Sequence, residues 1–163
     1  MDAVTAIRTR RTHKAYGPEP VDRETLDELF ELARWAPNHH LTNPWRFRVL
    51  GPRALERLKE ATGAESAGKL DRAPTLVVVS AVGNAEDRDA TAAAAYIVLL
   101  AAHARGLATY WRTPEVLHTP EGRAAVGVGD DEQVLGLLHL GRPRQEQRVP
   151  ERAPTTAVVT YLD

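Results

Sequence analysis

The chain of 163 residues contains no cysteine. It therefore has no disulfide, no thiolate nucleophile and no CxxC pair, so any redox chemistry must come from a bound cofactor. Serine is scarce as well, and the segment Ala64-Glu65-Ser66-Ala67-Gly68 falls one residue short of a nucleophile elbow. These absences argue against thiol chemistry and against serine hydrolysis.

An excess of charge of one sign is also missing. Lys and Arg number 21 and Asp and Glu 22, which gives a net charge of −1. A nearly neutral chain does not favour nucleic acid as a partner. The longest apolar run, Ala92 to Ala102, is too short to span a bilayer, and the first residues lack the apolar core of a signal peptide. We expect no nucleic acid, no membrane and a cytoplasmic location.

Two motifs that would assign a function are absent. The dinucleotide fingerprint GxGxxG is missing, because Gly127-Val128-Gly129 lacks the third glycine. The histidines show neither HExxH nor another metal-ligand spacing, so no metal site is expected. The length and a hydrophobic content of 43% suit one domain with a core of its own, spanning residues 1–163.

The hydrophobic pattern predicts both helices and strands along the chain. Helices are expected over 2–9, from Asp22 to before Pro37, around Leu55 to Ala61, over 91–105 up to Gly106, and from Thr119 onward. Strands are expected over 46–50, 75–79, 108–111, 133–140 and 156–162, with a linker over 62–72 and irregular structure over 142–154.

Three of these elements carry further expectations. The run over 75–79 is continuously apolar, which is typical of a central strand buried on both faces. The helix over 91–105 is apolar nearly all round, so it belongs in the core or at a subunit interface. An apolar strand over 156–162, at the very end of the chain, needs a neighbouring segment to pack against.

The segment Arg10-Arg11-Thr12-His13-Lys14 is the first candidate functional site. It places three permanent cations and a hydroxyl within five residues. Forked guanidinium donors and a hydroxyl suit a doubly charged phosphate. The cations also follow the C-terminal end of the first predicted helix, where the helix dipole favours them. The segment therefore predicts an anion site, although a solvated helix end is the ordinary alternative.

The second candidate is the segment from Ala36 to Trp45. Pro37 and Pro44 enclose a run of amide and imidazole donors, and a strand-like stretch begins at Trp45. This pattern predicts a polar loop beside a flat ligand. A third stretch, Trp111-Arg112-Thr113-Pro114, follows a predicted strand, where backbone groups often contact ligands, but a buried tryptophan beside a surface arginine explains it equally well.

Taken in order, these segments resemble the flavin-dependent nitroreductase family, in particular its short branch of NAD(P)H nitroreductases. The resemblance covers nearly the whole chain, and each motif is weak by itself. The motifs are Arg10-Arg11-Thr12, the Ala36-Pro37 to Pro44-Trp45 loop with Phe47, the apolar helix before Gly106, Trp111-Arg112-Thr113, Leu140 to Pro143, and the terminal Thr160-Tyr161.

The resemblance implies an α+β fold with a central, mostly antiparallel sheet flanked by helices. It also implies a homodimer with shared cofactor sites, each holding FMN at the subunit interface. Arg10, Arg11 and Thr12 would bind the ribityl phosphate, and Lys14 would reach the polar edge of the flavin ring or the ribityl chain.

The remaining roles implied by the resemblance concern the flavin ring. His39 of the partner subunit would pack near the ring, with Trp35 preceding it. Trp111, Arg112 and Thr113 would line the isoalloxazine, with backbone amides facing its redox-active edge, and Arg142 would add a phosphate or tail contact. The chain departs from the family at Asn38 and Asn43, where Ser and Gln are common, and it is shortened over about 60–90.

The activity implied by the resemblance is an FMN-dependent oxidoreduction. NAD(P)H would reduce the flavin, and a nitroaromatic, a quinone or a related small acceptor would take the electrons at the same face, in a ping-pong scheme. No catalytic side chain is expected, since the flavin carries the chemistry. The alternatives are a flavin-binding or flavin-sequestering protein with little turnover, and a flavin dehydrogenase or dehalogenase of the same fold.

Overall fold

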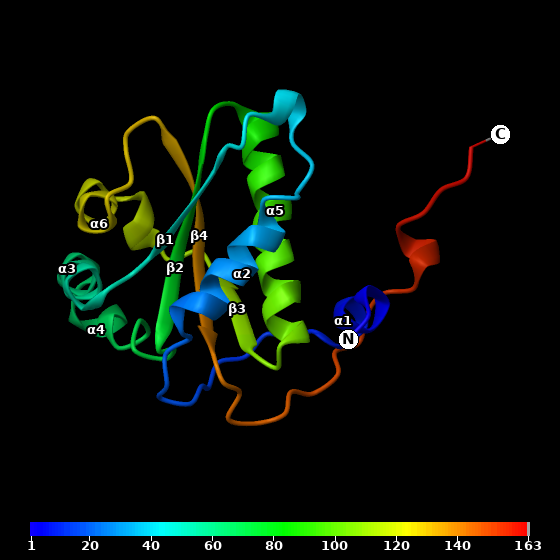
Figure 1. Cartoon of the computed structure of the whole chain (residues 1–163), viewed down its shortest axis with the longest axis horizontal. Helices are drawn as coiled ribbons and strands as arrows, with labels where there is room; N and C mark the ends of the chain where they lie inside the picture. Colours follow the sequence, from blue (N-terminus) through cyan, green and yellow to red (C-terminus); the bar gives the residue numbers. More distant parts are fainter. Residues whose placement is uncertain (163) are drawn as a thin grey trace.

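A four-stranded sheet runs through the middle of the molecule in the computed structural model, which describes residues 1–162 (Figure 1). The strands are β1 (Trp45–Val49), β2 (Thr75–Val82), β3 (Ala108–Arg112) and β4 (Glu132–Gly141), and they lie in the order β1-β2-β4-β3. All three strand pairs are antiparallel. The predicted α+β fold, with an antiparallel sheet and flanking helices, is confirmed.

Strand β2 lies between β1 and β4, and its side chains alternate between two apolar cores. Val77 and Val79 belong to one core, and Leu76 and Val78 belong to the other. Helices cover both faces of the sheet, so neither set of side chains needs to be polar. The prediction of a central strand buried on both faces is confirmed.

Helices α2 (Arg23–Ala33) and α5 (Ala85–Ala104) cover one face (Figure 1). Asp22 caps α2 by accepting a hydrogen bond from the Thr25 backbone N–H at 2.8 Å. Helix α5 begins earlier than the apolar pattern over 91–105 predicts, because Asn84 and Asp87 form a capping box ahead of a polar first turn. Gly106, with φ of 76°, follows its last turn in the left-handed conformation that ends many helices.

Helices α3 (Pro52–Thr62), α4 (Ala64–Ala67) and α6 (Pro120–Val126) cover the other face, together with the 3-10 turn η2 (Glu115–His118). Thr119 caps α6 by accepting a hydrogen bond from the Gly122 N–H at 3.1 Å. Segment 62–72 was predicted as a linker. It contains the short helix α4, so this prediction is only partly right.

The C-terminal segment differs from its prediction. Residues 156–162 were predicted as a strand, but the structure has the 3-10 turn η3 (Thr155–Ala157) followed by exposed residues outside any strand. In Figure 1 this segment extends away from the sheet and its helices. Val158, Tyr161 and Leu162 are 79%, 93% and 90% exposed. The prediction of a strand is wrong for this isolated chain, because a strand pattern specifies side-chain alternation and not the edge with which the strand pairs.

Among residues 1–162, no helix combines the length and the apolar character that crossing a membrane requires.

Candidate functional site

The predicted anion-binding segment lies along the outer edge of β3. Helix α1 (Ala3–Thr9) ends just before it, and the Arg10 N–H donates to the Ala6 carbonyl at 3.0 Å. Thr12 then forms a parallel bridge with Thr109 of β3, and the His13 N–H donates to the Thr109 carbonyl at 3.0 Å. The backbone of this segment is therefore fixed to the sheet, while the side chains of Thr12 and Lys14 are exposed.

Two histidines lie beside these cations. The Nε2 atom of His103, in the last turn of α5, lies 2.8 Å from the Thr9 hydroxyl and joins α5 to α1. Burial lowers the pKa of His103, and Arg10 and Arg11 lower it further. Burial also lowers the pKa of His13, with smaller effects of His103 and Arg10. Both imidazoles are therefore neutral at neutral pH, and the positive charge of the segment comes from its Arg and Lys residues.

Arg142 and Arg144 lie in different surroundings. Arg142 lines a pocket of about 200 Å³ with acidic residues, among them Glu19 and Asp22. The pKa of Asp22 is lowered mainly by hydrogen bonds from Thr25, and Arg142 adds a smaller effect. Arg144 lines a pocket of about 590 Å³ that also contains His13 and His103. Sequence reasoning selected Arg142, but Arg144 is the one that shares a pocket with the anion-binding segment.

Strand β3 points the side chains of Trp111 and Arg112 to opposite faces of the sheet. The Trp111 Nε1–H donates to the Leu135 carbonyl at 3.0 Å, on the face covered by α5. This position requires Gly136, because a Cβ there would lie 2.6 Å from the indole Nε1 and 2.3 Å from the Arg112 carbonyl oxygen. Gly136 has φ of 145° and accompanies a shift in the β2–β4 register. A flat ligand bound against one face of the sheet can therefore contact either the Trp111 or the Arg112 side chain, but not both.

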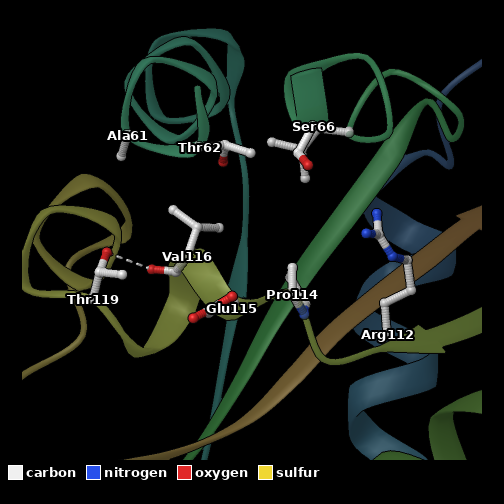
Figure 2. A pocket seen from close by; sticks show the side chains of 9 residues that line it. Ala61, Thr62, Ser66, Arg112, Pro114, Glu115, Val116 and Thr119 are labelled. Atoms are coloured by element: carbon white, nitrogen blue, oxygen red, sulfur yellow. Dashed lines mark hydrogen bonds between the residues drawn. The ribbon is translucent and has the colours of Figure 1, made fainter. Parts of the chain in front are cut away.

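Arg112 lines a pocket of about 250 Å³ on the face of α3, α4 and α6 (Figure 2). Figure 2 shows Arg112 at the right of this pocket with its guanidinium group pointing up, Pro114 and Glu115 to its left, and Ser66 and Thr62 higher in the view. The Thr119 hydroxyl donates to the Val116 carbonyl at 2.9 Å. Small hydroxyl side chains, one cation and one carboxylate make this a polar pocket directly beside the Trp111-Arg112-Thr113 turn.

The predicted ligand loop has an unusual backbone. His40, Leu41 and Asn43 have φ of 52°, 52° and 49°, which is left-handed backbone at residues other than glycine. Such backbone costs about 1 to 3 kcal/mol at a residue such as Leu41, less at Asn43, and it clusters at functional sites. The rings of His39 and His40 meet edge to face, with centroids 4.0 Å apart. Trp35, before the loop, is 77% exposed.

The loop and the anion-binding segment lie at opposite ends of α5. The Thr42 hydroxyl donates to Asp87 in the first turn of α5 at 2.6 Å, whereas Thr9 contacts His103 in the last turn. At a rise of 1.5 Å per residue, Asp87 and His103 are separated by roughly 24 Å. Figure 1 shows η1 (His39–Leu41) at one end of α5 and α1 beside the other. One chain therefore does not bring His39 to Arg10, Arg11 and Thr12.

Buried polar atoms gather where residues 12–16 meet β3 and β4. In the part of the chain that the structure describes, His13 Nδ1, Thr109 Oγ1 and both ring nitrogens of His139 have no hydrogen-bond partner. Burial, followed by Arg112 and Arg72, lowers the pKa of His139 to about 4. His139 is therefore a neutral imidazole within β4, beside the rings of Tyr16 and Tyr110. Its apolar strand context gave no functional signal in the sequence.

Over residues 1–162, no group of three or more His, Asp or Glu side chains is arranged to hold a metal ion.

The fold and the site together define an α+β protein with a cationic segment on one sheet edge and a strained polar loop at the far end of its longest helix. A family model described as "Nitroreductase family" matches residues 7–142. The chain belongs to this family and is an oxidoreductase.

A relative named as a nitroreductase matches over nearly the whole chain, and two solved structures share its fold. The Escherichia coli (strain K12) protein named "Putative NAD(P)H nitroreductase YdjA" is 27% identical, over 99% of this chain and 100% of its own. A nitroreductase-like family protein from Bacillus cereus has a crystal structure that matches with a TM-score of 0.90 at 22% identity, covering 100% of this chain and 97% of that one. The FMN-dependent nitroreductase NfnB from Mycobacterium smegmatis, solved in complex with NADPH, matches with a TM-score of 0.83 at 20% identity, covering 99% and 98%.

Proposed function

We propose that this protein is an FMN-dependent oxidoreductase that takes electrons from NAD(P)H and reduces a small acceptor, such as a nitroaromatic compound or a quinone. The observation that carries the proposal is the anchoring of Thr12 and His13 to Thr109, which holds the segment that follows Arg10 and Arg11 on the edge of β3. The proposal includes a cytoplasmic location.

The donor set of this segment fits the phosphate of FMN. Thr12 is exposed, Arg10 and Arg11 are half-buried, and the histidines beside them are neutral. Guanidinium and hydroxyl donors on a fixed backbone suit a doubly charged phosphate, because little ordering remains to be done when the ligand binds. Arg144, from the pocket that contains His13, adds a further cation at this end.

The residues toward the ring have distinct roles in the proposal. FMN, when bound, supplies a ring system that accepts a hydride from the nicotinamide and passes electrons to a second substrate. Lys14 stabilises negative charge at the polar edge of the ring. Trp111 is held by its bond to Leu135, so the backbone at 111–113 keeps a fixed place beside the ring. Arg142 shares its pocket with the acidic Asp22, so in the proposal it contributes little to binding of the phosphate.

The proposal includes a homodimer in which each site uses residues of both copies. His39 lies at the far end of α5 from the phosphate-binding segment, near Glu86, so it can complete a site only in a second copy. The exposed Trp35 is assigned to the same partner site. Exposed apolar residues are available for such an interface, namely Val4, Ile7, Trp35, Leu41, Val158, Tyr161 and Leu162. Large apolar interfaces of this kind are usually permanent.

Replacing Arg10 by Ala tests the phosphate site. The Arg10→Ala variant should bind FMN more weakly by about 1.5 to 3 kcal/mol, the range of a hydrogen bond to a charged group. Riboflavin, which lacks the phosphate, should bind the variant and the wild type equally. Both affinities are measured by titrating the apo-protein and following flavin fluorescence.

The matched control is Arg8→Ala, which removes a neighbouring exposed arginine of α1. It should leave FMN affinity unchanged. An equal loss of FMN and riboflavin affinity in Arg10→Ala would show that Arg10 is not a phosphate ligand. A colourless wild-type protein that also fails to bind added FMN would refute the whole proposal.

Steady-state oxidation of NAD(P)H with nitrofurazone or menadione separates an enzyme from a flavin-sequestering protein. The rate should scale with the amount of bound FMN.

A further inference from the structure

The strained loop 38–43 is joined to α5 by a hydrogen bond between side chains. The Thr42 Oγ1–H donates to Asp87 Oδ1 at 2.6 Å. Asp87 is 8% exposed, and its Oδ2 accepts a hydrogen bond from the Asn84 N–H at 3.0 Å. The hydrogen bond from Thr42 is also the main reason that the pKa of Asp87 lies below its usual value. The acceptor is therefore a charged carboxylate in a fixed position.

The other hydrogen bonds of the loop stay within it or reach neighbouring residues of the chain, since Asn38 Nδ2 donates to the Ala36 carbonyl at 3.2 Å and Arg46 Nη1 of β1 donates to the Asn43 carbonyl at 3.1 Å. The Asn43 N–H donates to Asn38 Oδ1 at 2.9 Å, and Asn43 Nδ2 donates to the Leu41 carbonyl at 2.7 Å. These bonds shape the loop and join it to its own flanks, and a further contact with α5 is weak because both side chains are exposed, His39 Nδ1 lying 3.9 Å from Glu86 Oε2. The Thr42–Asp87 bond instead ties the loop to a helix whose first turn is itself held, since the Thr91 hydroxyl donates to the Asp87 carbonyl at 2.8 Å.

The backbone conformation favours an attachment of this kind. Left-handed backbone at a residue such as Leu41 is strained and persists where the surroundings hold it, whereas Asn43 is a residue type that tolerates it. The loop also presents exposed side chains outward, with Leu41 at 76% exposure. Outward presentation suits a loop that acts on a second molecule rather than on its own core.

We propose that Thr42 and Asp87 form a latch that holds loop 38–43 in one conformation and thereby positions His39 for the flavin site of a second subunit. Thr42 and Asp87 are positioning residues, because they act through the loop and do not touch the cofactor. This inference rests on the proposed function, since it assumes a shared flavin site.

Three variants of the full chain test the latch. Thr42→Val removes the hydroxyl while keeping the shape of the side chain, and Thr42→Ser restores the hydroxyl. Asn84→Ala removes the side chain that caps α5 by accepting the Asp87 N–H, but it leaves the Thr42–Asp87 bond in place. Asn84→Ala therefore controls for a general loss of helix stability.

Two measurements are made on each variant: hydrogen exchange of the amides of residues 40–43 in the apo-protein, and affinity for FMN. In Thr42→Val, loop exchange should become about tenfold faster and FMN affinity should fall by up to about tenfold, because a hydrogen bond to a charged group is lost. Thr42→Ser should stay close to the wild type in both. Asn84→Ala should lower the melting temperature without changing either loop exchange or FMN affinity.

Unchanged loop exchange in Thr42→Val would show that no latch exists. Faster exchange with unchanged FMN affinity would show that the latch does not position the flavin site. An equal effect of Asn84→Ala on the loop would reduce the role of Asp87 to helix capping. Failure of the wild type to bind FMN would instead refute the proposed function and, with it, the positioning role of the latch. The hydrogen-exchange result would then still show whether the Thr42–Asp87 bond holds the loop.

Discussion

The Glu132 carboxylate, at the start of β4, joins three strands at the residue scale. It accepts a hydrogen bond from Arg48 Nη1 of β1 at 2.9 Å and a further one from the Ser80 hydroxyl of β2. The Gly129 N–H donates to its Oε1 at 3.0 Å. Burial by itself raises the pKa of Glu132, but the bonds from Arg48, Ser80 and Gly129 outweigh it and lower this pKa to about 2. The charged form is therefore the one that the fold stabilises.

This lowered pKa predicts acid sensitivity. Between the unfolded value of 4.5 and the folded value of about 2, the unfolded chain binds more protons at Glu132, so stability falls as the pH falls through this window. The contribution is present above pH 4.5 and amounts to about 2 kcal/mol, allowing for partial solvent screening. Urea unfolding at a series of pH values between 2 and 7 measures it.

The matched comparison is between two variants. Glu132→Gln should lower the unfolding free energy at neutral pH and flatten its dependence on pH below 4.5. Glu56→Gln, at an exposed position of α3, should change neither. A Glu132→Gln protein with the same pH dependence as the wild type would show that this carboxylate does not govern acid stability.

At the scale of elements, the C-terminal segment stands out among residues 1–162, because it forms no strand pair and its apolar side chains are exposed. Apolar side chains within residues 155–162 are exposed to solvent, and so are Val4 and Ile7 of α1. An apolar segment with no cover in its own chain gains most by burial against another molecule. In the proposed homodimer, that molecule is the second copy.

Deleting residues 155–163 should therefore weaken the dimer and reduce the flavin content of the purified protein together. Subunit mass by light scattering over a dilution series and the flavin-to-protein absorbance ratio report the two effects. A tail-less protein that stays dimeric with full flavin content would remove the segment from the interface. A full-length monomer at micromolar concentration that is still fully loaded with FMN would refute the shared site.

At the scale of the whole molecule, the chain has no feature typical of a separate nicotinamide-binding site. The dinucleotide fingerprint GxGxxG is missing, and the segment between α3 and β2, which could cover a bound nucleotide, is short. In the proposal, NAD(P)H and the electron acceptor therefore occupy one open pocket in turn.

Alternating occupation should give parallel lines in double-reciprocal plots when both substrate concentrations are varied. Each substrate should also inhibit competitively against the other at high concentration, and discrimination between NADH and NADPH should be modest. Initial-rate kinetics with the flavin-loaded protein measure these patterns. Converging lines would indicate a ternary complex and a separate nicotinamide site.

Much of the fold was predictable from the sequence because its signals are local. Asp22 and Thr119 precede α2 and α6 as caps, Gly106 follows α5, and β2 shows the continuous apolar run of a strand covered on both faces. The early start of α5 had a signal too, in the spacing of Asn84 and Asp87. Each of these features depends on hydrogen bonds or side-chain periodicity within one segment, so each is visible in a few adjacent residues.

The sequence by itself determined which side chains are available: no cysteine, a cluster of cations with a hydroxyl at 10–14, a polar loop at 36–45, and a resemblance that identified the family. Only the tertiary structure decided where they lie. It turned Trp111 and Arg112 to opposite faces, placed Arg142 beside Asp22, set the loop and the cations at opposite ends of α5, and left residues 156–162 without a strand partner. The physical reason is that these outcomes depend on contacts between segments far apart in the chain. Local periodicity specifies the alternation of side chains, whereas pairing and burial are set by the packed whole.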